Sequence, residues 1–363
     1  MRNLLKALFL LPFILIAHLV IAQNQTNIWY FSPDYAGVSF NSGVPKTLLN
    51  SAMHFYSDGG SACVSDTNGN ILFYSEGETI WNRNDSIMLN GTGLEGDNSA
   101  SQPALIVQKP GTSNTYYLFT IGSRNLARGL KYNIINMKLD NWNGSVVEKN
   151  QPVTAAVWAR DKLTAVKHAN GIDYWIISYD ILAEKFYSFL LTSQGINPSP
   201  IISNSKIYNS TSWYGPIKAA PDGEKIISCT RGVNGYGNGS FEVCDFDKSS
   251  GKLISKFTVK ESVANPNHFA VTGLEISPDS KLLYITSYLF PPGADNQSLL
   301  QYDLTQTDSV SFLNSSILID TTARIAGLQL APDGKIYGVR FLYPNNDSAF
   351  FYLDVINSSF GVN

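Results

Sequence analysis

Charged residues make up only 15% of this 363-residue chain, against about a quarter in an average globular protein. The formal net charge is −3 at pH 7, so Lys and Arg are not in excess. Binding to a nucleic-acid backbone or to anionic lipid depends on clustered basic residues. The composition therefore argues against a nucleic-acid partner and against attraction to an anionic membrane surface.

Cysteines and clustered metal ligands are also scarce. The three cysteines, Cys63, Cys229 and Cys244, are too few for a disulfide framework. Cys229 and Cys244 fall on neighbouring predicted strands, so a bridge between them is one alternative, and buried free thiols are the one we favour. No Cys/His spacing is typical of zinc, and residues 66–70 lack the later Glu of a calcium loop. We therefore predict no metal site and no cofactor.

Long apolar runs are missing after the first 22 residues, where no stretch approaches the roughly 20 apolar residues of a membrane helix. At the start of the chain, Arg2 and Lys6 precede an apolar run that ends in Val20-Ile21-Ala22. This pattern is typical of a secretory signal peptide, and we expect cleavage after Ala22. A retained N-terminal anchor is the alternative. Residues 23–363 are expected to form one exported domain, secreted or on the outer cell surface, that does not insert into the membrane.

What the sequence does contain is a repeat of strands and tight turns. Six turns built from Pro, Asp, Asn, Ser or Gly, which favour hairpin geometry, end at residues 69, 111, 171, 223, 280 and 334. Second strands rich in aromatic and β-branched residues follow at 71–75, 115–121, 173–179, 225–230, 281–288 and 335–340. Third strands follow at 79–83, 130–137, 185–192, 240–246, 299–305 and 349–356. Weaker fourth strands are predicted at 144–149, 199–206, 252–260 and 310–319.

Repeated four-stranded antiparallel units indicate the blades of a β-propeller. No amphipathic helix separates the units, which argues against a βαβ fold, and a two-sheet sandwich does not predict six similar units. The last unit lacks an outer strand, and segments 28–31 and 37–40 are free to supply one. We therefore predict an all-β propeller of six four-stranded blades whose ring is closed by the N-terminal segment. Seven blades are the alternative.

Three stretches carry a family resemblance. They are NIWYFSPDYAGVSFNSG (27–43), ILFYSEGETIWNRNDSIMLNGTGLEG (71–96) and SQPALIVQKPGTSNTYYLFT (101–120). These segments resemble the N-terminal propeller of large Bacteroidetes surface proteins. Those proteins are of the gliding-motility-associated kind and are exported by the type IX secretion system. The resemblance covers nearly all of residues 27–356, and it is specific in the first third and generic afterwards. It implies a propeller at the cell surface and supplies no catalytic residues. One departure is that no C-terminal sorting domain is recognisable in this chain.

Ligand sites of propellers usually lie where the loops that lead into the innermost strands converge. Those loops are expected at 96–103, 157–162, 211–215, 266–270 and 322–327. Aromatic faces and Arg side chains there can hold sugars or carboxylates. The candidate ligand-binding residues are Trp158, Arg160, Trp213, Tyr214, His268 and Arg324. The alternative is that these side chains only fill the channel and hold the blades together.

Signals for catalysis are weak. The histidines after the leader, His54, His168 and His268, are isolated, and no GxSxG motif is present. Residues 75–81 resemble the aspartate-box turn of sialidases but lack its aspartate. We predict no catalytic residues and favour a monomeric binding or adhesion module for a polysaccharide or a surface protein. A glycan-active hydrolase or lyase and a passive structural spacer are the alternatives.

Overall fold

The computed structural model describes residues 24–31, 36–53, 60–122, 129–156, 158–207, 215–230, 239–260, 270–288, 297–321, 325–342 and 350–356. The predicted signal peptide, residues 1–22, lies outside this part. None of the helices in the described ranges has the length and apolar character that a membrane crossing requires.

The strands form a series of antiparallel sheets that follow the order of the chain. The first sheet, preceded by the short turn η1 (Asn24–Thr26), contains β1 (Ile28–Tyr30), β2 (Gly37–Ser39) and β3 (Lys46–Leu48). The second unit contains β4 (Ala62–Ser65), β5 (Ile71–Ser75), β6 (Thr79–Asn82) and β7 (Ile87–Thr92). The third contains β8 (Ala104–Gln108), β9 (Thr115–Ile121), β10 (Leu130–Asn136) and β11 (Ser145–Pro152), with the turn η2 (Asp140–Trp142). A single parallel bridge between β7 and β11 joins these two units into one eight-stranded sheet.

The remaining units repeat the pattern. One contains β12 (Ala159–Lys167), β13 (Tyr174–Asp180), β14 (Lys185–Thr192), β15 (Gly195–Ile196) and β16 (Ile201–Asn204). The next contains β17 (Ile217–Ala219), β18 (Lys225–Thr230), β19 (Ser240–Asp247) and β20 (Lys252–Lys260). Then come β21 (Ala270–Ile276), β22 (Leu282–Tyr288), β23 (Gln297–Asp303), α1 (Ser309–Asn314) and β24 (Ile317–Asp320). The last sheet contains β25 (Ile325–Leu330), β26 (Ile336–Leu342) and β27 (Phe350–Ile356).

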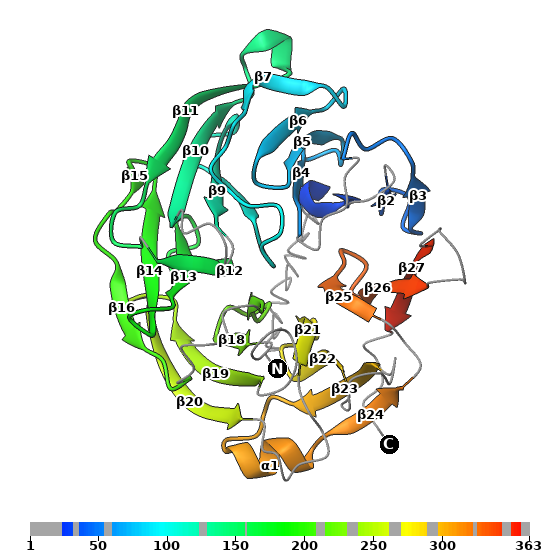
Figure 1. Cartoon of the computed structure of the whole chain (residues 1–363). Helices are drawn as coiled ribbons and strands as arrows, with labels where there is room; N and C mark the ends of the chain where they lie inside the picture. The colour runs from blue at the N-terminus through cyan, green and yellow to red at the C-terminus, as the bar shows by residue number, and fades with distance from the viewer. Residues whose placement is uncertain are drawn as a thin grey trace, which may run out of the picture.

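The first strand of each unit lies beside the first strand of the next, from β1 and β4 through β8, β12, β17 and β21 to β25. Figure 1 shows the sheets following one another around a common axis, so that the last sheet returns to the first. This arrangement confirms the prediction of an all-β propeller. The counts of six or seven blades stay predictions.

The closure of the ring differs from the expected strand pairing. In the described residues β1 pairs with β2, β2 pairs with β3, and β27 pairs with β26. The first and last sheets meet instead through side chains, because Trp29 and Phe40 pack on Tyr337 with ring centroids 6.1 and 5.3 Å away. Val38 and Ala331 complete this buried cluster. The N-terminal segment therefore lies against the last sheet by apolar packing.

One predicted strand is partly wrong. The stretch 310–319 begins within helix α1, and only its end forms β24. The reason is local, since the Asp308 carboxylate accepts hydrogen bonds from the amides of Val310 and Ser311 and caps the helix. The helix carries Phe312 into the core, where its ring stacks on Tyr302 at 4.8 Å and lies 5.2 Å from Phe257.

The cysteines confirm the favoured prediction of free thiols. Cys229 lies opposite Phe241 and Cys244 lies opposite Ile226, so the two thiols are not paired across β18 and β19. They also belong to different buried clusters on the two sides of the sheet. Alternation along the strands therefore keeps them apart.

The contact between units can be tested at a turn that packs on the preceding unit. Gly251 has φ +74°, and a Cβ there would lie 2.7 Å from the Trp175 ring of the preceding unit. Gly171 has φ +72°, but no atom lies within 4 Å of its hypothetical Cβ. We expect Gly171→Ala to lower the free energy of unfolding by about 1 kcal/mol through backbone strain alone. Gly251→Ala should cost about 1–3 kcal/mol more because of the clash. Urea denaturation of both variants measures this difference, and equal losses would contradict the described seam.

Candidate functional site

A bulge at the start of β12 carries three consecutive charged residues. Ala159 pairs with Asp180 and Leu163 with Ser178, so Arg160, Asp161 and Lys162 stand outside the regular ladder. Asp161 adopts φ 57°, in the left-handed region that residues with side chains rarely occupy. Bulges redirect side chains, and strained backbone persists only where the surroundings hold it. The contacts of Asp161 and Lys162 show what holds this bulge.

Asp161 joins the bulge to the preceding unit. Its Oδ1 accepts a hydrogen bond of 3.0 Å from the amide of Ser101, and its own amide donates to the carbonyl of Gly122 at 3.2 Å. Burial raises the pKa of the Asp161 carboxyl to about 6, and the hydrogen bond from Ser101 and the nearby Lys162 only partly oppose this shift. Its Oδ2 has no hydrogen-bond partner among the described residues. The carboxyl is therefore held in place but left half satisfied.

Lys162 joins the bulge to the following unit. Its ammonium is buried and donates hydrogen bonds to the carbonyl of Gly215 at 3.0 Å and to the carbonyl of Cys229. Burial lowers the pKa of Lys162 to about 8, against the opposing influence of Cys229 and Asp161. Because both acceptors are backbone carbonyls, this side chain holds β18 and the loop before β17 against β12.

Of these contacts, that of Gln102 joins the residues that are farthest apart in the sequence. Its side-chain amide donates to the carbonyl of Ile217 at 2.9 Å, and its carbonyl oxygen accepts from the amides of Ile217 at 2.9 Å and Leu163 at 3.4 Å. The primary amide thereby takes the place of a strand backbone beside β17. Segments 96–103 and 158–162 thus meet Gly215 and the start of β17 at one end of the strands.

Two of the six predicted ligand-binding residues lie in the described part, and the structure brings them together. The Arg160 guanidinium carbon is 5.7 Å from the centroid of the Trp158 ring. The Arg160 side chain is largely buried, whereas Trp158 is 43% exposed. Trp213, Tyr214, His268 and Arg324 lie outside the described residues. The ligand-binding role of all six stays a prediction.

The turn between β5 and β6 adds a buried acid, Glu76, which is not among the residues that the sequence predicts for the site. Glu76 is 3% exposed, and burial raises the pKa of its carboxyl to about 7 despite hydrogen bonds from backbone amides of its own turn. Its Oε2 has no partner among the described residues. The turn packs on segment 96–103, since the amide of Gly96 donates to the carbonyl of Gly77 at 3.1 Å. Glu76 therefore lies at the end of the strands from which segment 96–103 leads into β8.

The signal for Glu76 was present in the sequence but indirect. Glu76 directly follows the apolar strand 71–75, within a stretch that resembles the aspartate-box turn of sialidases but lacks its aspartate. The position of the turn against segment 96–103 depends on Gly77, whose φ is +102° and whose hypothetical Cβ would lie 3.0 Å from the carbonyl oxygen of Pro103. In the sequence, the signal is a glycine that directly follows an acid at the end of an apolar strand.

Other polar groups along the inner strands are engaged with one another. The Lys218 ammonium lies 2.8 Å from both Glu275 Oε2 and Gln329 Oε1, which joins β17, β21 and β25. Glu275 Oε2 also accepts from the amide of Leu330 at 2.9 Å. In the described part of the chain, no group of three or more His, Cys, Asp or Glu side chains is arranged to hold a metal ion.

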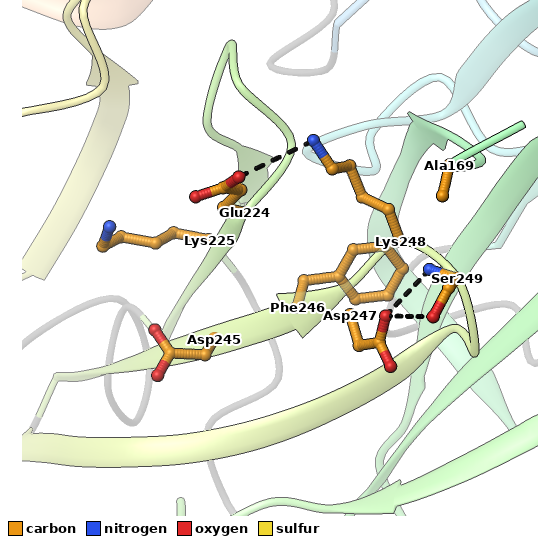
Figure 2. A pocket seen from close by; sticks show the side chains of 8 residues that line it. All are labelled: Ala169, Glu224, Lys225, Asp245, Phe246, Asp247, Lys248 and Ser249. Carbon is orange, nitrogen blue, oxygen red and sulfur yellow. Dashed lines mark hydrogen bonds and ion pairs between the residues drawn. The ribbon is translucent and has the colours of Figure 1, made fainter. Parts of the chain in front are cut away.

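A surface hollow at the other end of β12 has a different character. Figure 2 shows its lining, which comes from the turn after β12 and from turns and strand ends of the following unit. The Lys248 ammonium donates to the carbonyl of Asp222 at 2.8 Å and lies 3.8 Å from Glu224, while Asp247 accepts from the amide and hydroxyl of Ser249. These charges are engaged in the turns themselves, so the hollow is a seam between units and we assign it no ligand.

Known proteins resemble this chain in structure and not in sequence. No protein-family model matches the sequence, and no curated protein matches it. A solved structure of a putative 6-phosphogluconolactonase from Bacteroides fragilis has a TM-score of 0.51 at 10% identity, over 92% of this chain and 97% of that chain. An endo-arabinase from Bacteroides thetaiotaomicron has a TM-score of 0.38 at 11% identity, over 70% of this chain and 93% of that chain. A periplasmic gluconolactonase from Pseudomonas aeruginosa has a TM-score of 0.37 at 10% identity, over 79% of this chain and 98% of that chain.

Identities this low show a shared fold and nothing of a shared reaction. The first of these similarities, which covers almost the whole of both chains, supports the propeller fold. By fold the chain is therefore a β-propeller, and its site has to be argued from its own residues.

The two buried carboxyls predict an unusual dependence of stability on pH. Their folded pKa values, about 6 for Asp161 and about 7 for Glu76, lie above the ordinary values near 4. The folded state therefore binds more protons than the unfolded state between about pH 4 and pH 7, and stability falls as pH rises through this window. Between pH 4.5 and pH 7, the free energy of unfolding of the wild-type protein should fall, and we expect Asp161→Asn and Glu76→Gln each to reduce this fall by on the order of 2 kcal/mol. Thermal unfolding at pH 4.5 and 7 measures it, and a wild-type profile identical to that of both variants would contradict the described burial.

Proposed function

We propose that this propeller recognises carbohydrate at the end of the channel where Trp158 and Arg160 lie. The observation that carries the proposal is the pairing of an exposed indole with a guanidinium on a bulge held by neighbouring units. An indole face packs against the apolar face of a sugar ring, and a guanidinium donates to hydroxyl or carboxylate oxygens. Because Asp161 and Lys162 tie the bulge to the preceding and following units, we expect the two recognition groups to keep a fixed position without a ligand.

The comparisons are compatible with this proposal without carrying it. The similar structure from Bacteroides fragilis is named a putative 6-phosphogluconolactonase, but one propeller fold hosts many functions. The proposal also includes export of residues 23–363, a place on the cell surface and a polysaccharide partner, which rest on the N-terminal sequence and the family resemblance. A monomeric state belongs to the same proposal.

A glycan-active enzyme is the second candidate, and Glu76 is the specific observation in its favour. A buried carboxyl with a pKa of about 7 is protonated in about half of the molecules at neutral pH, and the protonated form can give its proton to a glycosidic oxygen as the bond breaks. The unpartnered Oε2 is the atom that would carry this proton. A base or nucleophile on the other side of the bond would complete the reaction.

Binding at the channel end predicts a large effect of two substitutions. Trp158→Ala and Arg160→Ala should each weaken binding to arabinan, xylan or β-glucan by about 10- to 100-fold, since each tenfold corresponds to about 1.4 kcal/mol of lost contact. Affinity gel electrophoresis in each polysaccharide measures the change. Ile172→Ala, which truncates an exposed side chain at the opposite end of β12, is the control and should bind normally. Binding that neither Trp158→Ala nor Arg160→Ala weakens would contradict the proposal, and failure of the wild-type protein to bind any of the polysaccharides would favour the passive spacer.

If the protein is a glycan-active enzyme, a substitution of Glu76 should affect turnover and binding differently. If the wild-type protein releases reducing sugar from a polysaccharide that it binds, Glu76→Gln should lower kcat by about 100-fold or more and leave binding within a factor of two. The amide has the shape of the acid but no proton to donate. Unchanged turnover in the variant would exclude Glu76 as the acid, and the absence of wild-type turnover would leave binding alone.

A further inference from the structure

The turn between β10 and β11 has a backbone conformation that is unfavourable for residues with side chains. Asp140, Asn141 and Trp142 have φ of 49°, 51° and 69°, so three consecutive residues with side chains are left-handed. Asn and Asp tolerate this region, but a bulky aromatic residue there is exceptional. Such a conformation is retained where the surroundings impose it or a function uses it.

The contacts that hold the turn do not involve the indole. The amides of Trp142 and Gly144 donate to the carbonyl of Leu139 at 3.1 Å each, and the amide of Asn143 donates to Asp140 at 2.9 Å. Gly144 packs so closely that a Cβ would lie 2.8 Å from atoms of both Met137 and Met88. The backbone and Gly144 therefore fix the turn to the core.

A second link ties the turn to the neighbouring unit. The side-chain amide of Asn84, in the turn between β6 and β7, donates to Asn143 Oδ1 at 2.9 Å. Figure 1 shows the link between β10 and β11 projecting at the outer edge of the ring, beside β7. The strained turn is therefore rigidly presented away from the axis of the propeller.

The indole itself faces solvent. Trp142 is 52% exposed and belongs to none of the buried clusters of the described residues. Asp140, Asn141 and Asn84 are exposed around the same turn. An exposed ring bordered by amide and carboxylate groups offers an apolar face together with donors and acceptors for hydroxyls. Protein hot spots instead lie at the centre of well-packed apolar patches.

We propose that this turn is a second carbohydrate-binding surface, in which the ring of Trp142 stacks on one sugar of a polysaccharide and the neighbouring amides bind its hydroxyls. It extends the proposed carbohydrate recognition to the outer edge of the ring, and it does not depend on Trp158 or Arg160. Two separate contacts on one long chain would raise the avidity of the whole molecule.

Trp142→Gly tests the proposal, because glycine adopts the observed φ without strain. We expect its Tm to be equal to or above that of the wild-type protein, while retardation in arabinan, xylan or β-glucan gels weakens by about tenfold or more. Leu139→Ala, which truncates another exposed side chain of the same turn, is the matched control and should bind as the wild type does. Trp158→Ala should retain the part of binding that Trp142 supplies.

The outcomes separate the two surfaces. Loss of binding in Trp142→Gly together with normal binding in Trp158→Ala would support the outer surface and remove the channel-end proposal. A lower Tm with unchanged retardation would show that the indole is structural and would overturn the inference. Failure of the wild-type protein to bind any of the three polysaccharides would overturn it as well.

Discussion

The structure depends on how polar groups are satisfied where the inner strands of neighbouring sheets meet. Backbone amides and carbonyls that lose water there need other partners, and buried side chains supply them. Lys162 donates to carbonyls of the following unit, and Gln102 bonds both backbone groups of Ile217. Burying an ionised group is costly unless hydrogen bonds replace the lost water, and Lys162 obtains both of its acceptors from the following unit.

This constraint also positions the candidate site. The same bulge that turns Asp161 and Lys162 toward neighbouring units places Trp158 and Arg160 beside each other at the end of the strands. The residues that hold the bulge and the proposed recognition groups are thus adjacent in sequence but have different contacts. The outer turn at Trp142 follows the same principle, since Gly144 and Asn143 hold it while the indole remains exposed.

The sequence predicted most of the strands because their signals are local. Turn residues and the apolar strands after them define β5, β9 and β18 with the observed bounds, and β14 and β20 likewise. Local signals also misled where two of them competed, as in the stretch after Asp308, whose capping carboxylate began a helix. The closure of the ring by Trp29, Phe40 and Tyr337 was not readable, because aromatic residues do not reveal whether they pack or pair. Contacts such as that of Gln102 with Ile217 join residues 115 positions apart and leave no trace in either segment.

The most direct measurement of the central claim is a crystal structure of the protein with a bound oligosaccharide from a polysaccharide that retards it. The account predicts a sugar ring on the exposed face of Trp158, with one of its oxygens within hydrogen-bonding distance of the Arg160 guanidinium. A saccharide ordered only elsewhere, with Trp158 bare, would contradict it.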